Sequence, residues 1–292
     1  MYRPKESPFE NMNNEIKSAN IHINRICNYN CGFCFARNLD RSILTPEQWR
    51  SRLSYLKKEG VTKLNLAGGE PTLYPHFIEL CHLAKEMGFI VSIVTNGSMI
   101  NGEKIEKMMG KVDWIGLSID SPDNNVEKSV GRQCSSLNHI TNVIEVARLA
   151  HEKNIKVKLN ITVIRQSWKQ DFSELINMIN PERVKAFQVL RVEGENEDLF
   201  DEYSITKDEW EHFKNNHNKI VLRNGEMLVF EGDDDMIDSY LMLDPSGNIM
   251  KNTGNRQSIV PFSVIAADGL AAAVDAKKYH DRGAVYRWGS PL

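Results

Sequence analysis

The sequence predicts an α/β fold in which a parallel sheet curves around a polar interior. A short strand followed by an amphipathic helix repeats from about residue 19 to residue 191. Six such units imply right-handed crossovers, so the sheet is either open and doubly wound or a complete or partial barrel. The predicted strands are, in chain order, Ala19–Asn24, Thr62–Leu66, Ile90–Thr95, Asp113–Ile119, Lys156–Val163 and Val184–Arg191.

Alternation within the strands favours the curved arrangement. Parallel strands covered on both faces are apolar throughout, whereas here one face of several strands is polar. The polar positions are Asn20, His22 and Asn24, then Lys63 and Asn65, then Lys156, Lys158, Asn160 and Thr162, and finally Arg183 and Lys185. The apolar faces must meet the helices, so the polar faces are predicted to line a lumen, with ligands toward the C-terminal strand ends.

Four cations in one lumen imply an anionic ligand. Lys63, Lys158, Arg183 and Lys185 repel one another unless an anion joins them, so a polyanion such as a triphosphate is the natural partner. The alternative is that these side chains extend from the strand ends into water.

Capping residues and apolar spacing predict two of the helices in detail. Thr45-Pro46-Glu47-Gln48 is typical of an N-cap, a first-turn proline and a capping box, and Gly60 ends that helix. Another helix is predicted to begin near Leu137, with Ile140, Val143, Ile144 and Ala147 on its core face.

The repeated pattern stops near residue 196. GENEDLFDEY is predicted to be an acidic loop, Thr206–Asn216 a helix, and Asp233–Asp235 a solvated loop. Tyr240–Leu243 and Asn248–Met250 flank a turn signal and predict a hairpin. We therefore expect a lead-in over residues 1–18, a barrel over 19–195, and a cap over 196–292 that completes the site.

Composition excludes several classes of protein. The chain has 292 residues, of which 41% are apolar and 26% charged, so wholesale disorder is excluded. The net charge of −3 gives no general attraction to nucleic acid or anionic lipid. No apolar run is long enough to span a membrane, and the first residues lack the apolar region of a secretory signal. We expect a cytoplasmic protein.

The cysteines indicate a metal site. Cys27, Cys31 and Cys34 crowd together, and an odd total of five does not suggest a disulfide framework. Three thiolates leave one iron of an Fe₄S₄ cluster open; zinc, with a fourth ligand such as His22, is the alternative. Cys81 falls on a helix face with Phe77, Leu80 and Ala84 and is predicted to be core, whereas Cys134 is predicted to be a loop thiol.

With these motifs in place, the chain resembles the radical S-adenosylmethionine (SAM) superfamily. The resemblance rests on the CxxxCxxC loop with Phe33 before its third cysteine, Gly68-Gly69-Glu70-Pro71, Thr95-Asn96-Gly97 and Ser118, each after its own strand. It implies a partial (β/α)₆ TIM-type barrel with a C-terminal capping segment, a [4Fe-4S] cluster on the three cysteines, and SAM as cofactor. The SAM-binding residues implied are Phe33, Gly68, Gly69, Glu70, Asn96, Ser118 and Arg132. A flavodoxin or ferredoxin is the implied electron donor.

Longer segments, among them NIHINRICNYNCGFCF, KLNLAGGEP and DSYLMLD, resemble the viperin family. That resemblance implies dehydration of CTP, GTP or UTP to the 3′-deoxy-3′,4′-didehydro nucleotide, a chain terminator in antiviral defence. It assigns a catalytic role to Tyr240 and substrate binding to Asn20, Lys63, Lys158, Asn160, Arg183, Lys185 and Arg256. Gln257 replaces a phosphate-binding lysine of the family and Ala67 a serine, and no N-terminal amphipathic membrane helix is expected.

Two other functions stay open from the sequence. One is a different radical SAM enzyme, acting on a peptide or a nucleotide-derived substrate; the absence of cysteines after Cys134 disfavours the auxiliary clusters that many of these need. The other is a non-catalytic iron–sulfur or zinc module, which leaves the polar lumen unexplained.

Overall fold

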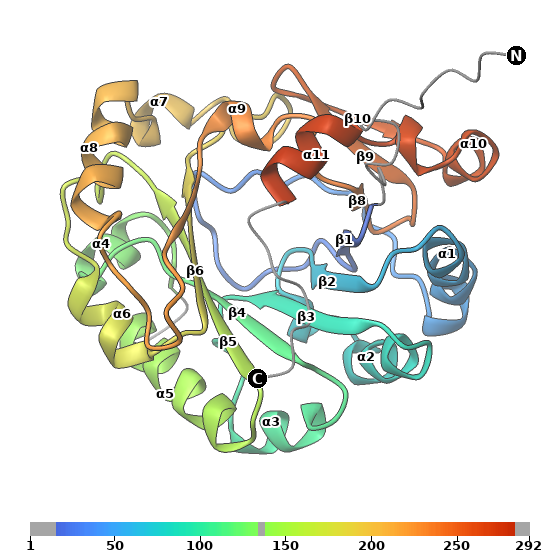
Figure 1. Ribbon diagram of the computed structural model, residues 1–292, viewed down its shortest axis with the longest axis horizontal. Helices are drawn as coiled ribbons and strands as arrows, with labels where there is room; N and C mark the ends of the chain where they lie inside the picture. Colours follow the sequence, from blue (N-terminus) through green and yellow to red (C-terminus); the bar gives the residue numbers. More distant parts are fainter. Residues whose placement is uncertain (1–15, 134–137, 284–292) are drawn as a thin grey trace, which may run out of the picture.

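The computed structural model describes residues 16–133 and 138–283, and a single ten-stranded sheet organises them. The strand order is β10-β9-β8-β1-β2-β3-β4-β5-β6-β7, and β1 to β6 pair in parallel with their chain neighbours (Figure 1). These six strands are β1 Ser18–His22, β2 Lys63–Ala67, β3 Ile90–Thr95, β4 Trp114–Ser118, β5 Lys156–Val163 and β6 Arg183–Gln188. All six predicted strands are therefore present, within two or three residues of their expected ends.

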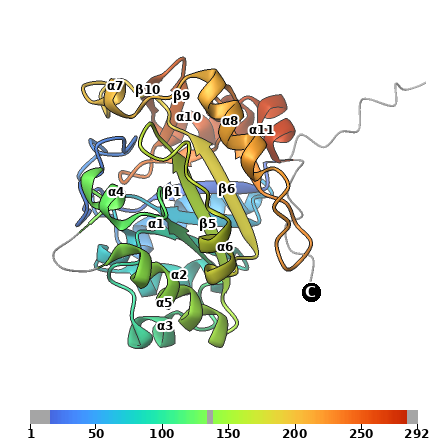
Figure 2. The ribbon, with the colours of Figure 1, turned by 90° about the vertical axis from the view of Figure 1, so that its left-hand side faces the viewer.

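Helices cover the outer face of this curved sheet, as both ribbon views show (Figures 1 and 2). They lie between successive strands, and β10 and β7 stand at the two ends of the strand order, so the sheet is a partial barrel, as predicted. The helices are α1 Pro46–Lys58, α2 Phe77–Glu86 after the short turn η1 Pro71–Leu73, α3 Gly102–Met108, α4 Asn124–Ser129, α5 His139–Glu152 and α6 Ser173–Ile179.

The predicted start of α1 is confirmed. The Thr45 hydroxyl accepts from the Gln48 backbone N–H at 3.3 Å, and the Gln48 side chain accepts from the Thr45 N–H at 2.8 Å. This reciprocal pair satisfies two of the donors that every helix start leaves open. The helix then buries Trp49 and Leu53 against the sheet, and Gly60 follows its end with φ +90°.

Alternation along the strands divides them as the sequence predicts. On β5, Val157, Leu159 and Ile161 are fully buried in the core between sheet and helices. Lys158 and Asn160, on the other face, line an internal cavity. Asn24 is an exception, since it lies beyond the end of β1, fully buried, and donates to the Glu70 carbonyl oxygen at 3.0 Å.

The C-terminal segment joins the sheet instead of only covering it. Three-residue β7, Val229–Glu231, extends the sheet beside β6, and β8, Met242–Leu243, lies parallel to β1. The predicted hairpin is confirmed by β8 and the antiparallel strand β9, Ile249–Thr253, and a further strand, β10 at Arg256–Val260, follows it. The segment therefore contributes side chains to both edges of the lumen.

Two loop predictions in this segment are wrong. Asp233–Met236 forms the short helix α9, because acidic side chains are favourable in a first turn and Asp235 accepts from the Gly232 N–H at 2.8 Å. The acidic stretch before it contains α7, Phe200–Tyr203, because Tyr203 is buried against the Phe33 ring. The predicted helix near residue 206 is α8, Lys207–His217. The remaining helices are α10 Phe262–Asp268, η2 Leu270–Ala272 and α11 Ala276–Gly283.

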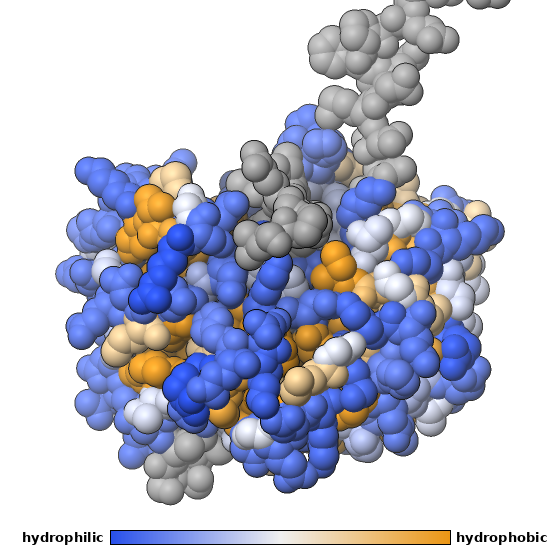
Figure 3. Space-filling view, turned by 60° about the horizontal axis from the view of Figure 1, so that its bottom comes forward, coloured by the Kyte–Doolittle hydropathy of each residue, from blue (hydrophilic) through white to orange (hydrophobic). Residues whose placement is uncertain are grey.

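Some expectations fall on parts that the structure does not describe. Residues 1–15 and Cys134 lie outside the described residues, and the helix expected near Leu137 is described from His139 onward. Across residues 16–133 and 138–283, no helix is long and apolar enough to cross a bilayer. On the face shown in Figure 3, hydrophobic residues lie in separate places among hydrophilic ones.

Cys81 is a core residue, as predicted. Its side chain is fully buried in α2 among apolar neighbours, and burial raises its thiol pKa. Cys81→Ser is expected to lower the free energy of unfolding by about 1–3 kcal/mol, because the smaller, more polar hydroxyl replaces a well-packed sulfur. Urea unfolding measures this, with Cys81→Ala as the control that changes volume without adding a hydroxyl; equal losses in the two variants would contradict the argument.

Candidate active site

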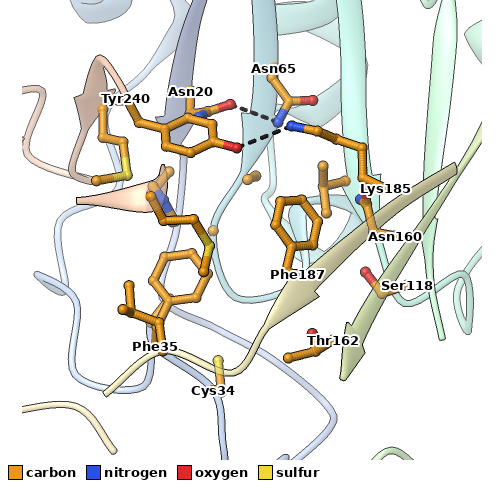
Figure 4. Close-up of a pocket in the computed structure, with 18 of the residues that line it drawn as sticks. Asn20, Cys34, Phe35, Asn65, Ser118, Asn160, Thr162, Lys185, Phe187 and Tyr240 are labelled. Atoms are coloured by element: carbon orange, nitrogen blue, oxygen red, sulfur yellow. Dashed lines mark hydrogen bonds between the residues drawn. The ribbon is translucent and has the colours of Figure 1, made fainter. Parts of the chain in front are cut away.

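A cavity of about 330 Å³ lies inside the curved sheet and collects most of the predicted site residues. Its lining includes the three cysteines, Phe33, Gly68, Gly69, Asn96, Ser118, Arg132, Asn20, Lys63, Lys158, Asn160, Arg183, Lys185 and Tyr240. Figure 4 shows the central part, with Asn20 and Asn65 joined by a hydrogen bond of 2.8 Å and Cys34 on the far side from Lys185. The predicted polar lumen is therefore present.

The cysteine loop follows β1 and presents its sulfurs to this cavity. Two interactions reach the Cys27 sulfur, from the Tyr29 N–H at 3.4 Å and the Asn96 side chain at 3.9 Å. Burial raises the pKa of Cys34 to about 11, and it raises those of Cys27 and Cys31 as well. Cys27 is exposed at the cavity surface and Cys31 and Cys34 are half-buried. Neighbouring thiols with raised pKa values are stable as thiolates only when a cationic group binds them.

Backbone segments pack closely around the cysteine loop, and glycine is needed where they meet. A Cβ on Gly131 would collide with the Asn30 carbonyl oxygen, and the Asn30 N–H donates to the Gly131 carbonyl at 3.1 Å. Gly68, with φ +146°, and Gly69 lie equally close to the backbone leading to Cys27. This packing leaves the thiols and backbone groups open to the same space, which fits an iron–sulfur cluster with a small polar cofactor beside it.

Glu70 is buried and does not line the cavity. Its carboxylate accepts from the Thr72 N–H and hydroxyl, the Thr95 hydroxyl at 2.7 Å and the Asn96 N–H at 2.8 Å. These bonds tie the end of β2 to the end of β3, so the glutamate fixes the loop geometry while Gly68, Gly69 and Asn96 face the cavity. A direct contact of Glu70 with SAM stays a prediction.

Arg132 lies beside the cysteines and is held by acids that sequence reasoning missed. Its guanidinium forms a close ion pair with Asp120 and lies 3.6 Å from Glu127. Burial and the neighbouring Asp120 raise the pKa of Glu127 to about 8. His139, whose pKa burial lowers to about 3, bonds the Ser118 carbonyl at 2.9 Å and is neutral. The signal available in the sequence was the charge of the segment DSPDNNVEKSVGR, residues 120–132, but a charge pattern does not show which side chains point inward.

The four predicted cations converge at the end of the cavity formed by β2, β5 and β6. Lys63 and Arg183 lie over the Trp114 ring, at 5.2 and 5.3 Å from its centroid. Burial and the neighbouring cations lower the pKa of Lys158 to about 7 and keep that of Lys63 well below its ordinary value. Such a cluster gains charge and stability when an anion enters, which is the physical signature of a phosphate site.

Tyr240 reaches the same end from the C-terminal segment. The Lys185 ammonium donates to its hydroxyl at 3.1 Å (Figure 4), and the hydroxyl donates to Glu231. The Arg282 guanidinium lies 3.6 Å above its ring. Glu231 and Arg282 were not identified from the sequence, because three-residue β7 shows no periodicity and α11 lies far along the chain from the barrel.

Arg256, predicted to bind the substrate, is exposed and does not line the cavity. Its side chain is 79% exposed at the start of β10 and lies 3.7 Å from a Glu193 carboxylate oxygen. The neighbouring Gln257 lines the cavity instead and donates to the Phe35 carbonyl at 3.2 Å. In an antiparallel edge strand successive side chains face opposite sides, so only one of the two neighbours can face inward.

Comparison with known proteins defines the class. The radical SAM superfamily profile matches residues 21–179. SuiB of Streptococcus suis bound to S-adenosylmethionine has a TM-score of 0.65 at 20% identity, over 91% of this chain and 67% of SuiB. anSMEcpe with bound AdoMet has a TM-score of 0.64 at 16% identity, over 91% and 82% of the two chains. These two structures share the fold.

Three relatives bear the name S-adenosylmethionine-dependent nucleotide dehydratase. The protein of Thermoplasmatales archaeon (strain ISO4-H5) is 46% identical over 94% of this chain and 97% of its own, and that of Flammeovirga pacifica is 32% identical over the same shares. RSAD2 of Siniperca chuatsi is 30% identical over 93% of this chain and 79% of its own. The chain therefore belongs to the radical SAM superfamily and, within it, to the viperin-like nucleotide dehydratases. Its cofactors are the [4Fe-4S] cluster and SAM of that superfamily.

We expect nucleotide binding to depend on pH through the lysine cluster. Because the pKa of Lys158 is lowered to about 7, a phosphate that pairs with Lys158 above pH 7 is expected to bind together with a proton. Triphosphate affinity is therefore expected to fall by up to about tenfold per pH unit between about pH 7 and 9. Calorimetry at pH 8 in buffers of different ionisation enthalpy is expected to show proton uptake.

A matched control uses a cation that does not titrate. Arg183→Ala is expected to weaken triphosphate binding by roughly tenfold or more, because a charged partner of the phosphates is lost. The fall of affinity with pH is expected to persist but to move to higher pH, because Arg183 is one of the cations that lower the pKa of Lys158. Pyrimidine or purine nucleosides without phosphates are expected to bind far more weakly than the triphosphates. A pH-independent affinity would show that Lys158 does not contact the phosphates.

Proposed function

We propose that this protein dehydrates a nucleoside triphosphate, CTP, GTP or UTP, to its 3′-deoxy-3′,4′-didehydro form. The observation that carries the proposal is the shared cavity of about 330 Å³, with three cysteines at one end and four cations at the other. This arrangement brings a radical-generating centre and a triphosphate site to one space. The names of the relatives support a nucleotide as the substrate class.

Residues at the first end fit the two cofactors. Cys27, Cys31 and Cys34 would ligate three irons, and cavity-facing Gly68, Gly69, Asn96, Ser118 and Arg132 would hold SAM. When bound and reduced, the pair supplies a 5′-deoxyadenosyl radical for hydrogen abstraction. Arg132 is positioned to pair with the SAM carboxylate, since Asp120 and Glu127 orient its guanidinium.

Residues at the second end would position the substrate. Lys63, Lys158, Arg183 and Lys185 bind the triphosphate through charge-assisted hydrogen bonds, and Asn20 and Asn160 line the ribose space between the two ends. Loss of the 4′ hydrogen atom and the 3′ hydroxyl, with one proton and one electron added, gives water and the 3′,4′ alkene. Tyr240 supplies the proton to the departing oxygen, because its buried phenol stays protonated at neutral pH.

The C-terminal segment, residues 196–292, completes this site in the proposal. Tyr240, Asn252, Gln257 and Arg282 from that segment line the cavity together with barrel residues. We infer that the barrel and the cap act as one catalytic unit, with Arg256 available to a triphosphate only if β10 shifts toward the cavity.

The decisive experiment is incubation of the reconstituted protein with SAM, dithionite and each nucleoside triphosphate. Mass spectrometry is expected to show a nucleotide lighter by one water, together with 5′-deoxyadenosine, for at least one of CTP, GTP and UTP. 5′-Deoxyadenosine without any dehydrated nucleotide would favour another radical SAM reaction, and neither product would favour a binding module.

The biological role follows from the product. A nucleotide without a 3′ hydroxyl terminates nucleic-acid chains, so expression is expected to hinder a virus or phage, with a flavodoxin or ferredoxin as electron donor. A plaque assay comparing the wild type with the three-cysteine variant tests this role, and protection by that variant would contradict it. The cytoplasmic location stays a prediction.

A further inference from the structure

Glu231 is a buried carboxylate behind the end of the cavity where the cations and Tyr240 lie. It ends β7, its side chain is 3% exposed, and it contacts three residues that line the cavity. One carboxylate oxygen pairs closely with Lys185 and lies 3.9 Å from Arg282; the other accepts from the Tyr240 hydroxyl. Glu231 itself does not line the cavity among the described residues, so it acts through these neighbours.

The negative charge of Glu231 opposes binding of the triphosphate. Burial would raise the pKa of Glu231, but Lys185 and Arg282 lower it below its ordinary value, so the carboxylate is ionised. An ionised carboxylate repels a triphosphate and competes with it for Lys185. Phosphate affinity therefore does not explain a glutamate at this position.

The position of Glu231 beside Tyr240 and Lys185 does explain why a glutamate lies there. The Tyr240 hydroxyl donates to Glu231 and accepts from Lys185 at 3.1 Å, while the Arg282 guanidinium covers the ring at 3.6 Å. Arg282 is itself fixed by two hydrogen bonds to the Ser239 carbonyl, at 3.1 and 2.8 Å. The phenol is thus held at its hydroxyl by Glu231 and Lys185 and across its face by Arg282 of α11.

We propose that Glu231 is a positioning residue that fixes the Tyr240 hydroxyl and the Lys185 ammonium for dehydration, at a cost in triphosphate affinity. This role rests on the proposed function. When the triphosphate enters, Lys185 and Arg282 turn part of their hydrogen bonding to it. Glu231 holds the phenol in place until its single proton turns from Glu231 to the departing oxygen.

Glu231→Gln removes the charge at nearly constant size. An amide has one accepting atom, so it cannot accept from the cations on one side and from Tyr240 on the other. Because Glu231 raises the pKa of Lys185, affinity is compared at pH 6, below the Lys185 pKa of about 8. Triphosphate affinity is expected to rise there by about threefold or more, because one repulsive charge is lost. Dehydrated product per 5′-deoxyadenosine is expected to fall by about tenfold, because the phenol loses its partner. We call this ratio of dehydrated product to 5′-deoxyadenosine the coupling. A glutamate that only stabilised the fold would not give tighter triphosphate binding together with poorer coupling when replaced.

Glu231→Asp separates charge from position. The charge stays, but the shorter side chain withdraws from Tyr240, so affinity is expected to remain within about twofold of the wild type while coupling falls. Asp244→Asn is the matched control: Asp244 is a buried carboxylate of the same segment whose side chain bonds, among the described residues, within its own turn to Ser246 and Asn248. That variant is expected to change neither quantity.

The measurements use the reconstituted protein with cluster and SAM. Calorimetry with tripolyphosphate and with CTP gives affinity, chromatography gives both products, and thermal unfolding checks each variant. Binding that fails to tighten in Glu231→Gln, or coupling equal to the wild type in both variants, would overturn the proposal. If the wild type itself yields no dehydrated nucleotide, the proposed function fails, and the tripolyphosphate experiment alone decides whether Glu231 competes for the cations.

Discussion

Replacing Cys27, Cys31 and Cys34 together with alanine is expected to abolish 5′-deoxyadenosine formation. The three thiols line the same cavity, and burial keeps them protonated unless a cationic group binds. Without them no iron is held, so SAM cannot be cleaved reductively. Iron and sulfide assays, the visible absorption and chromatography of the nucleoside measure the loss, which is expected to be complete.

The control for this variant is Cys81→Ala. Cys81 is a fully buried core thiol, away from the cavity lining, and its loss is expected to affect stability but not iron content. If the three-cysteine variant retained the brown colour and the activity, the cluster would have to lie elsewhere, and the assignment would be wrong.

Tyr240→Phe is expected to separate radical formation from product formation. The substitution keeps the ring beneath Arg282 but removes the hydroxyl that bonds Glu231 and Lys185. Hydroxide leaves poorly without a proton, so 5′-deoxyadenosine is expected to form while alkene product falls by about 100-fold or more. Chromatography of both products in one reaction gives the ratio directly.

Tyr279→Phe is the matched control for that experiment. Tyr279 is also buried in the C-terminal segment, but its hydroxyl accepts from the Ser18 N–H at 2.7 Å and Tyr279 is not among the described residues that line the cavity. Full alkene yield from Tyr240→Phe would return the acid role to a lysine or to water. An equal loss in both variants would indicate a general effect of the cap on folding.

Short-range patterns account for what sequence reasoning predicted correctly. The capping box at Thr45 and the alternation along β5 depend on residues a few positions apart in sequence. They can therefore be recognised without knowledge of the rest of the fold. The same alternation placed Lys158 and Lys185 in the lumen, since a strand with one apolar face has only one way to meet its helices.

Predictions failed where neighbours in space, rather than in sequence, decide. The aspartates of Asp233–Met236 carry no apolar period, yet they begin a helix beside β6, where the Asp233 N–H donates to the Gln188 side chain at 3.4 Å. Arg256 faces outward because the register of β10 against β9 presents its neighbour Gln257 to the cavity, and no local signal fixes that register.

The sequence by itself determined the strand–helix repeat, the cysteine loop, the cationic face of the lumen and the family. Tertiary structure alone decided that Glu70 is a buried tie between strands, that Asp120 and Glu127 hold Arg132, and that Glu231 and Arg282 enclose Tyr240. The physical reason is that a periodic pattern specifies which face of an element is buried, whereas a buried charge needs partners that only the folded chain brings within reach.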